Sequence, residues 1–434
     1  MNQATSTNCI FPVTDFTEVK NKVLNWANRF NTFCFLDNHQ YTLKPHSVEC
    51  ILAANIVKYV AANSGNALEQ LEQFIGSRSS HRSKWSFGHL GYDLKNEIEN
   101  VYSSHSDRIE FPDLFFFQPE VIIRFDKNEM IIESETANED KLFHEILASE
   151  GSQQITSTPI AIRNRIDKQE YISIIQKLRK HILRGDCYEI NFCQEFFAEN
   201  VVIDPLTVYK KLSVVSPNPF SALYKLDDKY LICASPERFL KKQGKKILSQ
   251  PIKGTSKRVG NKQQDDESKN ELFQSPKDRS ENVMVVDLVR NDLSKICTEA
   301  TVRVDELYQV YSFPQVHQMI STISGELKDG ISFSEIIKAL FPMGSMTGAP
   351  KRKVVELIEQ YEKTRRGIFS GAVGYITPEG DFDFNVVIRS IMYNARNKYL
   401  SIQTGSGITF YSDAEKEWEE CLLKAEAMKK VLES

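Results

Sequence analysis

The chain of 434 residues is too long for one ordinary domain and long enough to bury a large core. Its 41% hydrophobic and 26% charged residues are typical of a folded globular protein and argue against a disordered one. The formal net charge of −4 offers no electrostatic attraction to nucleic acid or to an anionic membrane surface.

Eight cysteines are scattered along the chain without Cys-x-x-Cys pairs, and several lie inside apolar patterns, as Cys34 and Cys233 do. We therefore predict reduced core cysteines rather than disulfides or metal ligands. No apolar run approaches the roughly 18 residues that span a bilayer, and the first residues lack a signal-peptide pattern. We expect a cytoplasmic protein with neither nucleic acid nor membrane as a partner.

The first third of the chain mixes two kinds of pattern. Helices are predicted at 47–60 and 67–76, and aromatic-rich strands at 113–118 and 121–125. The polar run 151–159 is the best candidate for a linker. We therefore predict an N-terminal region of residues 1–155 and a catalytic region of residues 156–434, packed together as one α/β unit.

The patterns after this linker are sharper. Residues 167–184 predict an amphipathic helix that ends at Gly185, and 187–194 predict a strand with Glu189 and Asn191 on one face. We further predict a surface loop at 256–280, strands at 230–235, 371–376, 383–391 and 399–403, and helices at 279–292, 333–340, 350–361 and 413–432. The order has no regular βαβ rhythm, which favours an α+β or mixed-sheet fold over a doubly wound one.

Lys253 and Glu237 are the first candidates for chemistry. Lys253 lies in the tight run 251–255, where it is either a surface lysine or a desolvated nucleophile with a lowered pKa. Glu237 follows a predicted strand and precedes Arg238, so it is either an ion-pair partner or, if buried, a general acid. The spacing alone leaves both alternatives open.

Two acidic pairs suggest a cation site. Glu417, Glu420 and Lys424 share a face of the last predicted helix, and Asp278 and Glu281 begin another. Acid-rich helix faces are usually solvated surface, but an apolar run follows Glu281 and indicates that this end is buried. Paired carboxylates suit Mg²⁺, which takes a few of them and keeps water for an anionic substrate.

Two glycine-bearing loops suggest an anion site. The run 341–351 leads into a predicted helix, whose N-terminus favours negative charge. Gly405 and Gly407 lie in a second loop, and Arg389, between the two loops, could clamp a carboxylate. Each signal is weak alone, but together they predict a site for a small polyanionic acid and Mg²⁺.

Several of these runs occur together, in order, from about residue 165 to the end. They are 185–188, 235–239, 251–255, 277–282 with 286–292, 341–351, 371–375 and 404–407 with the last helix. In this the chain resembles the chorismate-binding enzymes, which include anthranilate synthase component I, isochorismate and salicylate synthases, and aminodeoxychorismate synthase component I. The resemblance implies an anthranilate synthase component I-like fold with large, mostly antiparallel sheets flanked by helices.

The resemblance is closest to aminodeoxychorismate synthase component I, because Lys253 stands where anthranilate synthases carry alanine. It implies that Lys253 attacks C2 of chorismate while the C4 hydroxyl leaves, with Glu237 as general acid. Ammonia then enters at C4 and expels the lysine, giving 4-amino-4-deoxychorismate for 4-aminobenzoate and folate synthesis. We expect burial to make both the amine and the carboxyl neutral.

Other roles also follow from the resemblance. Mg²⁺ is expected on Glu281 and Glu420, with Asp278 and Glu417 behind them. The substrate is expected to contact Ser345, Phe369, Arg389, Gly405, Gly407 and Lys424. A tryptophan pocket is expected around Pro219, Phe220 and Ser221, with 35–38 as its other half.

Two departures qualify the resemblance. Gln318 stands where anthranilate synthase carries a catalytic histidine, and His317, one place away, should point elsewhere, so it is a minor candidate. Glu189 stands where amine-inserting members usually carry glutamine and water-inserting members lysine, which disfavours an isochorismate-type reaction.

The nitrogen source and two alternatives stay open. The chain carries no glutaminase signature, so we expect free ammonium or, preferably, a glutamine amidotransferase subunit to supply ammonia. The nearest alternative is anthranilate synthase component I, which aminates C2. An alternative of another class is a catalytically silent homologue that binds chorismate or a partner.

Overall fold

The computed structural model describes residues 9–433 except 43, 46–47, 64, 77–83, 152–158 and 314–315. The predicted linker, at 151–159, therefore lies almost wholly outside the described residues. No helix within the described ranges is long and apolar enough to cross a membrane. All eight cysteines are free, as predicted.

The described residues form eleven α-helices and two short 3₁₀ helices. The α-helices are α1 Phe16–Ala27, α2 Ala67–Ile75, α3 Lys95–Glu99, α4 Glu139–Leu147, α5 Lys168–Leu183, α6 Pro205–Val215, α7 Lys262–Gln274, α8 Pro276–Ile296, α9 Phe333–Leu340, α10 Lys351–Tyr361 and α11 Ala414–Glu433. The 3₁₀ helices are η1 Tyr92–Leu94 and η2 Gly344–Met346.

Twenty strands accompany them. They are β1 Cys9–Pro12, β2 Thr32–Asp37, β3 Cys50–Ala62, β4 Ser86–Leu90, β5 Leu114–Phe125, β6 Glu129–Ser134, β7 Arg163–Asn164, β8 Glu189–Glu199, β9 Phe220–Leu226, β10 Lys229–Ser235, β11 Arg238–Gln243, β12 Lys246–Gln250, β13 Ile252–Lys257, β14 Arg303–Ser312, β15 Val316–Glu326, β16 Gly348–Ala349, β17 Ala372–Ile376, β18 Phe382–Asn385, β19 Ser390–Asn394 and β20 Tyr399–Ile408.

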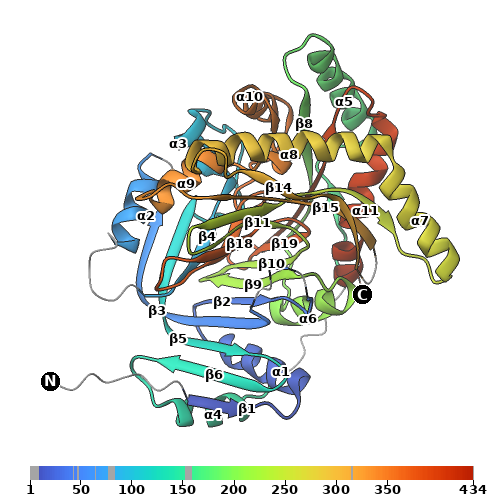
Figure 1. The fold of residues 1–434 in the computed structure, drawn as a ribbon. Helices are drawn as coiled ribbons and strands as arrows, with labels where there is room; N and C mark the ends of the chain where they lie inside the picture. The colour runs from blue at the N-terminus through green and yellow to red at the C-terminus, as the bar shows by residue number, and fades with distance from the viewer. Residues whose placement is uncertain are drawn as a thin grey trace.

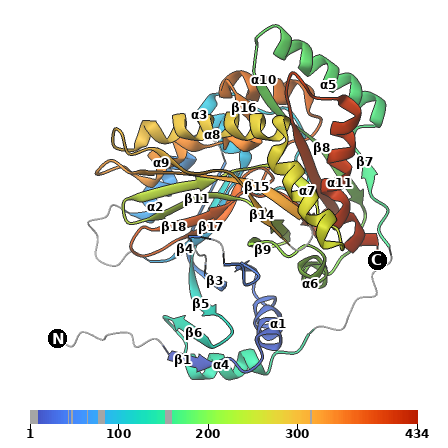
Figure 2. The ribbon, with the colours of Figure 1, turned by 45° about the vertical axis from the view of Figure 1, so that its right-hand side comes forward.

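Every pairing between these strands is antiparallel, and the pairings join them into one network. Strands of the first 155 residues pair with later ones, β2 with β9 and β4 with β17. Helices α8 and α9 lie over one side of the sheet, α1 and α4 lie beside β1 and β6, and α5 and α11 flank β8 and β20 (Figures 1 and 2). The predicted fold class, mixed helices and large antiparallel sheets, is confirmed.

Helix α8 shows how the sequence positions a site residue. Ser275 caps its N-terminus by accepting from the Asp278 N–H, and Pro276 occupies the first turn. Glu281, Val285, Val289 and Leu293 recur every four residues and form one buried stripe. The apolar members of this stripe pack in the core and so fix Glu281 on the inner face of the helix.

Four element predictions are wrong. The strand predicted at 383–391 is broken between β18 and β19, and the loop predicted around Gly405 and Gly407 is part of β20. Residues 47–60 were predicted as a helix, but β3 occupies Cys50–Ala62 between β2 and β5. Because its first five residues are all buried, they form a continuous apolar run that does not distinguish a helix from a strand. The region 256–280 was predicted as a loop, but it contains α7 and the start of α8.

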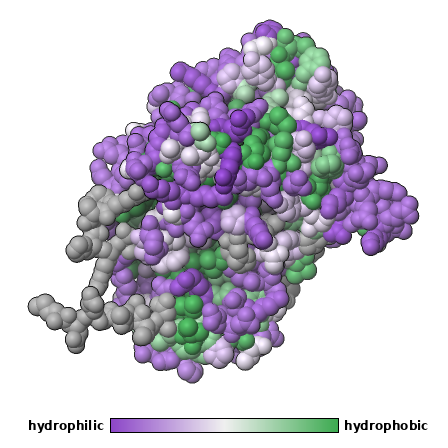
Figure 3. All heavy atoms as spheres, viewed as in Figure 1, coloured by the Kyte–Doolittle hydropathy of each residue, from purple (hydrophilic) through white to green (hydrophobic). Residues whose placement is uncertain are grey.

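Helix α7 was predicted as a loop because its sequence is almost entirely polar. Within it, Asp265 and Leu272 are the buried residues, and Asn261 caps its N-terminus through the N–H groups of Gln263 and Gln264. On the face shown in Figure 3, the end of α7 projects at the right and is hydrophilic, while hydrophobic residues gather in small separate patches. A helix with so narrow a buried side carries almost no apolar periodicity in its sequence.

Candidate active site

Lys253 lies at a β-bulge. Strand β13 pairs with β15 from Ile252 opposite Ile320 to Thr255 opposite Gln318, so β13 holds one extra residue across Lys253 and Gly254. Gly254 has φ +88°, which favours glycine, and a Cβ there would lie 3.0 Å from the Asp278 side chain. Bulges re-aim side chains, and here the bulge directs Lys253 into a buried position beside α8.

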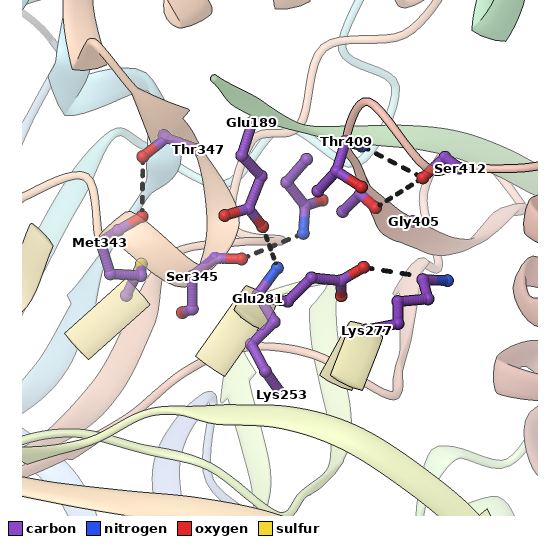
Figure 4. A network of polar contacts seen from close by, with 12 residues as sticks. Glu189, Lys253, Lys277, Glu281, Met343, Ser345, Thr347, Gly405, Thr409 and Ser412 are labelled. Atoms are coloured by element: carbon purple, nitrogen blue, oxygen red, sulfur yellow. Dashed lines mark hydrogen bonds and ion pairs between the residues drawn. The ribbon is translucent and has the colours of Figure 1, made fainter. Parts of the chain in front are cut away.

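Lys253 forms a buried ion pair with Glu189. Its Nζ lies 2.5 Å from Glu189 Oε1 (Figure 4). Burial by itself would lower the pKa of Lys253, but the charges of Glu189 and Glu281 outweigh it and raise that pKa above its ordinary value. The expectation of an amine made neutral by burial is therefore wrong, because the acidic residues around it stabilise the ammonium.

Glu189 is the first residue of β8, and the strands on either side of β8 fix its position. Ala349 of β16 pairs with Glu189, and Ile408 of β20 pairs with Ile190. Gly348, at φ +144°, brings β16 so close that a Cβ there would lie 2.0 Å from the Glu189 carbonyl oxygen. The Glu189 backbone is therefore fixed, and its side chain points to Lys253.

Glu237 is a buried carboxyl with a hydroxyl partner. Ser345 Oγ donates to Glu237 Oε1 at 2.7 Å, which brings together two residues predicted for the site. Burial raises the pKa of Glu237 to about 7, although Ser345 and Lys253 act in the opposite direction. A cavity of about 10 Å³, room for roughly one water, adjoins both side chains. Burial thus raises the pKa as expected, and the role of Glu237 as general acid stays a prediction.

Arg389 occupies the break between β18 and β19, which were predicted as one strand. It is partly buried with φ +50°, and desolvation lowers its pKa to about 10 despite the nearby Glu237. Gln318 faces it: with the amide oxygen turned inward, that oxygen accepts from Nη2 at 2.9 Å and Nη1 at 3.3 Å. Gln318 thus orients a guanidinium suited to a carboxylate.

His317 points away from this group. Its Nε2 lies 3.1 Å from Asp265 Oδ1 on α7, and its Nδ1 lies 2.9 Å from Ser312 Oγ. Neighbouring residues of β15 face opposite sides of the strand, so Gln318 faces Arg389 while His317 faces α7. The structure therefore does not bring His317 together with Lys253.

Gly405 and Gly407 were predicted in a loop, but both belong to strand β20, whose end lies against the ion pair. A Cβ at Gly407 would lie 2.6 Å from Lys253 Nζ and 2.7 Å from Glu189 Oε1. Lys424 Nζ donates to the Gly405 carbonyl at 2.8 Å and pairs with Glu420 at 2.6 Å. Both glycines and Lys424, predicted as substrate contacts, therefore border the Lys253 group.

Carboxylates from α8 and α11 face one another. Lys277 lies between them, 3.2 Å from Glu417 and 3.8 Å from Glu281. Burial raises the pKa of Glu281 to about 7, and among the described residues no hydrogen bond is donated to the buried Glu281 Oε1 or Glu417 Oε2. Asp278 lies against Gly254, and its place behind the metal ligands stays a prediction.

These donors fit a Mg²⁺ ion. Within the described residues no three His, Cys, Asp or Glu side chains converge as a ready-made cage. Mg²⁺ usually takes one or two carboxylates and fills its remaining positions with water and substrate oxygens, so such a cage is not required. Glu281 and Glu417 share Lys277, and each has a buried carboxylate oxygen that accepts no hydrogen bond. A Mg²⁺ ion would satisfy such oxygens.

The two remaining predictions concern Phe369 and the tryptophan pocket. Phe369 is buried in the main hydrophobic cluster, and its contact with substrate stays a prediction. Pro219, Phe220 and Ser221 line a cavity of about 40 Å³ together with 36–38, so the two predicted halves do meet. Whether tryptophan binds there also stays a prediction.

Sequence reasoning did not assign three contacts that organise this site. They are the Glu189–Lys253 pair, the Lys277 bridge, and Asn191, whose Nδ2 donates to the Ser345 carbonyl at 3.0 Å. Asn191 shares the predicted strand face with Glu189, and Lys277 is four residues from Glu281. The sequence pattern therefore already placed both residues next to predicted site residues. Together the groups place a lysine, a carboxyl with a raised pKa and several cations in one site.

Comparisons with known proteins agree with this chemistry. A family model described as chorismate binding enzyme matches residues 32–430. An aminodeoxychorismate synthase component 1 from Bacillus subtilis is 32% identical over 363 residues, covering 80% of this chain and 77% of that protein. An anthranilate synthase component I-like protein from Synechocystis is 32% identical over 351 residues, covering 80% and 72%.

Solved structures share the fold. Anthranilate synthase component I from Streptococcus pneumoniae has a TM-score of 0.76 at 25% identity, covering 90% of this chain and 94% of that one. The isochorismate synthase MenF from Escherichia coli has a TM-score of 0.79 at 16% identity, covering 98% and 94%, which shows the fold alone. With the family model matching most of its length, the chain belongs to the chorismate binding enzymes.

Proposed function

We propose that this chorismate-utilising enzyme is an aminodeoxychorismate synthase component I, which aminates chorismate at C4. The observation that carries the proposal is Lys253, buried in the site between Glu189 and Gly407 of strand β20. A lysine in this position can act as a nucleophile towards the substrate. An enzyme in which ammonia attacks chorismate directly does not need such a lysine.

The first half of the reaction uses the two acid–base pairs of the site. Lys253 passes a proton to Glu189, and its amine attacks C2 of chorismate. The ring double bonds shift, and the C4 hydroxyl leaves as water with the proton of Glu237. Arg389 and Lys424 supply positive charge for the substrate carboxylates.

The second half reverses the bond changes. Ammonia attacks C4, the C2–Nζ bond breaks, and its electron pair returns to Lys253. The released amine regains the proton from Glu189, and the new ammonium group at C4 gives one to Glu237. The balance is chorismate plus ammonia to 4-amino-4-deoxychorismate plus water, and both carboxyls return to their starting states.

The metal and the nitrogen source belong to the same proposal. Mg²⁺ held by Glu281 and Glu420, with Glu417 behind them, would neutralise a substrate carboxylate. The term component 1 in the relatives' names implies a second component, and we propose a glutamine amidotransferase subunit in this role.

A product assay tests the proposal. The purified chain is incubated with chorismate, Mg²⁺ and ammonium chloride, and the products are separated and identified by mass. We expect 4-amino-4-deoxychorismate from the wild type, and a loss of about a thousandfold or more in the Lys253→Ala variant. Lys257→Ala, an exposed lysine on the same strand, is the matched control and should retain activity.

Two other outcomes would favour the alternatives. Anthranilate formed without a separate lyase would show amination at C2 and identify an anthranilate synthase component I, as in relatives of equal identity. Chorismate binding with no turnover by the folded protein, with or without Mg²⁺, would indicate the catalytically silent homologue.

A further inference from the structure

Among the described residues, one edge of strand β8 has a stretch that no other strand covers. Strand β16 pairs with the first two residues of β8, and β7 pairs with Phe196 and Phe197. Between these two short strands lie the Asn191 carbonyl and the Cys193 N–H, which face this edge because β20 occupies the other one. Buried backbone groups of this kind need hydrogen-bond partners.

A buried ion pair takes the place of the missing strand. Glu362, the residue after α10, accepts from the Cys193 N–H at 2.8 Å, and Arg366 Nη2 donates to the Asn191 carbonyl at 2.9 Å. Arg366 and Glu362 are joined by two hydrogen bonds, Nε to Oε2 at 2.9 Å and Nη2 to Oε1 at 2.6 Å. Each residue is only 3% exposed, and two parallel bonds fix their relative orientation.

Arg366 also reaches the turn that carries Ser345. Its Nη1 donates to the Met346 carbonyl at 2.7 Å and to Ser370 Oγ at 3.3 Å. The guanidinium lies over the Tyr92 ring, with Cζ 4.5 Å from the ring centroid. Every N–H group of the guanidinium therefore has an acceptor within the protein, and none is left to bind a substrate.

Ser345 is held by the two groups that Arg366 holds. Met346 follows Ser345 in η2, and Asn191 Nδ2 donates to the Ser345 carbonyl at 3.0 Å. Arg366 bonds the carbonyls of both Met346 and Asn191, so it joins the Ser345 turn to β8. From this turn Ser345 Oγ donates to Glu237 Oε1 at 2.7 Å.

We propose that Arg366 is a positioning residue for the proton donor of the reaction: by joining the Ser345 turn to β8, it holds the Ser345 hydroxyl on Glu237. This rests on the proposed function, in which Glu237 gives its proton to the leaving C4 hydroxyl. Glu362 neutralises the buried guanidinium and completes the edge of β8. Without the join, Ser345 can move away from Glu237 while the residues that bind the substrate carboxylates stay in place.

The Ser345 bond acts on the charge state of Glu237. Burial raises the pKa of Glu237 to about 7. The groups that act in the opposite direction are the Ser345 hydroxyl, Lys253, the Ile252 N–H and Arg389. Loss of the Ser345 bond therefore raises the pKa of Glu237 further. Because a general acid works in its protonated form, kcat then stays level to a higher pH before it falls.

The pH profile of the Arg366→Lys variant tests the inference. Lysine keeps the positive charge beside Glu362 but lacks the planar fork that reaches the two carbonyls. Consumption of chorismate with Mg²⁺ and ammonium is measured across the pH range in which Glu237 titrates. We expect kcat on the low-pH plateau to fall roughly tenfold and KM for chorismate to stay within about threefold. The fall of kcat should move up by about one pH unit.

The double variant Arg366→Lys/Ser345→Ala shows whether Arg366 acts through Ser345. Ser345→Ala alone should show the same upward move of the pH profile. If Arg366 acts through this hydroxyl, kcat of the double variant should match that of Ser345→Ala within about twofold. Two independent losses would multiply instead.

Arg365→Lys is the matched control, because Arg365 is the neighbouring arginine and pairs with Asp93 and Asp113. It should leave the pH profile where it is in the wild type. Thermal unfolding verifies that each variant is folded. If Arg366→Lys does not fold, Arg366→Met/Glu362→Gln removes both charges together, leaves no buried charge unpaired, and should give the same upward move.

An unshifted pH profile in the folded Arg366 variant, with an active wild type, would overturn this inference alone. Losses of kcat that multiply in the double variant with Ser345→Ala would also overturn it. If the wild type itself consumes no chorismate, the proposed function fails and the inference fails with it, a result distinct from the other two.

Discussion

At the scale of single residues, charge state decides which groups can react. Lys253 is stabilised as an ammonium by Glu189 and Glu281, whereas Glu237, equally buried, has a pKa of about 7. The difference arises because the carboxylates around Lys253 outweigh its burial, whereas at Glu237 burial outweighs Ser345 and the cations Lys253 and Arg389. Lys253 is thus favoured as a cation, and Glu237 takes up a proton far more readily than an exposed glutamate does.

Glu237 gives a pH prediction. As a general acid it must be protonated, so kcat for amination should be level at low pH and fall about tenfold per pH unit above about 7. Activity is therefore lost as pH rises through the raised pKa. Glu237→Gln keeps the size of the side chain but cannot donate the proton, and should lose about a hundredfold or more. A flat profile, or full activity in that variant, would rule out this role.

At the scale of elements, the site depends on backbones that approach closely. Gly407 of β20 leaves room for the Lys253–Glu189 pair, and a Cβ there would meet both side chains. We expect Gly407→Ala to lower kcat/KM for chorismate on the order of a hundredfold, because the nucleophile is displaced. Gly260→Ala, with nothing within 4 Å of the added Cβ, should have no effect on steady-state kinetics.

The facing helices α8 and α11 give a metal prediction. Glu281→Gln removes one proposed ligand, so the Mg²⁺ concentration for half-maximal activity should rise tenfold or more, roughly the effect of losing one charge-assisted contact. Asp287→Asn, an exposed residue of α8 paired with Arg290, is the control. If Glu281→Gln kept full activity without any dependence on Mg²⁺, the proposed Mg²⁺ site would be wrong.

Elements were predictable where their burial is one-sided. Helices α5, α9 and α11 were predicted within a residue or two, because each has one apolar face and a recognisable start. Strand β3 was missed because its first residues are apolar without alternation, and α7 because it is nearly all polar. The bulge at Lys253 depends on the register against β15, which lies about 65 residues further along the chain and leaves no local signal.

At the scale of the whole molecule, the site assembles from segments far apart in sequence. The order of the motifs predicted which residues gather, and Glu237, Ser345, Gly407 and Lys424 do border Lys253. It could not predict which atoms touch: Glu189 and Lys253 are 64 positions apart, and their pairing follows from β8, β13 and β20 meeting. That pairing reversed the predicted charge of the lysine.

The most direct test of the central claim is the mass of the enzyme during the first half-reaction. Wild-type protein is mixed with chorismate and Mg²⁺ without ammonium, digested, and analysed by peptide mass spectrometry. We predict an adduct of chorismate less one water on the peptide that contains Lys253, which disappears on addition of ammonium as 4-amino-4-deoxychorismate forms. Formation of that product with Lys253 unmodified throughout, or with full activity in Lys253→Ala, would contradict the account.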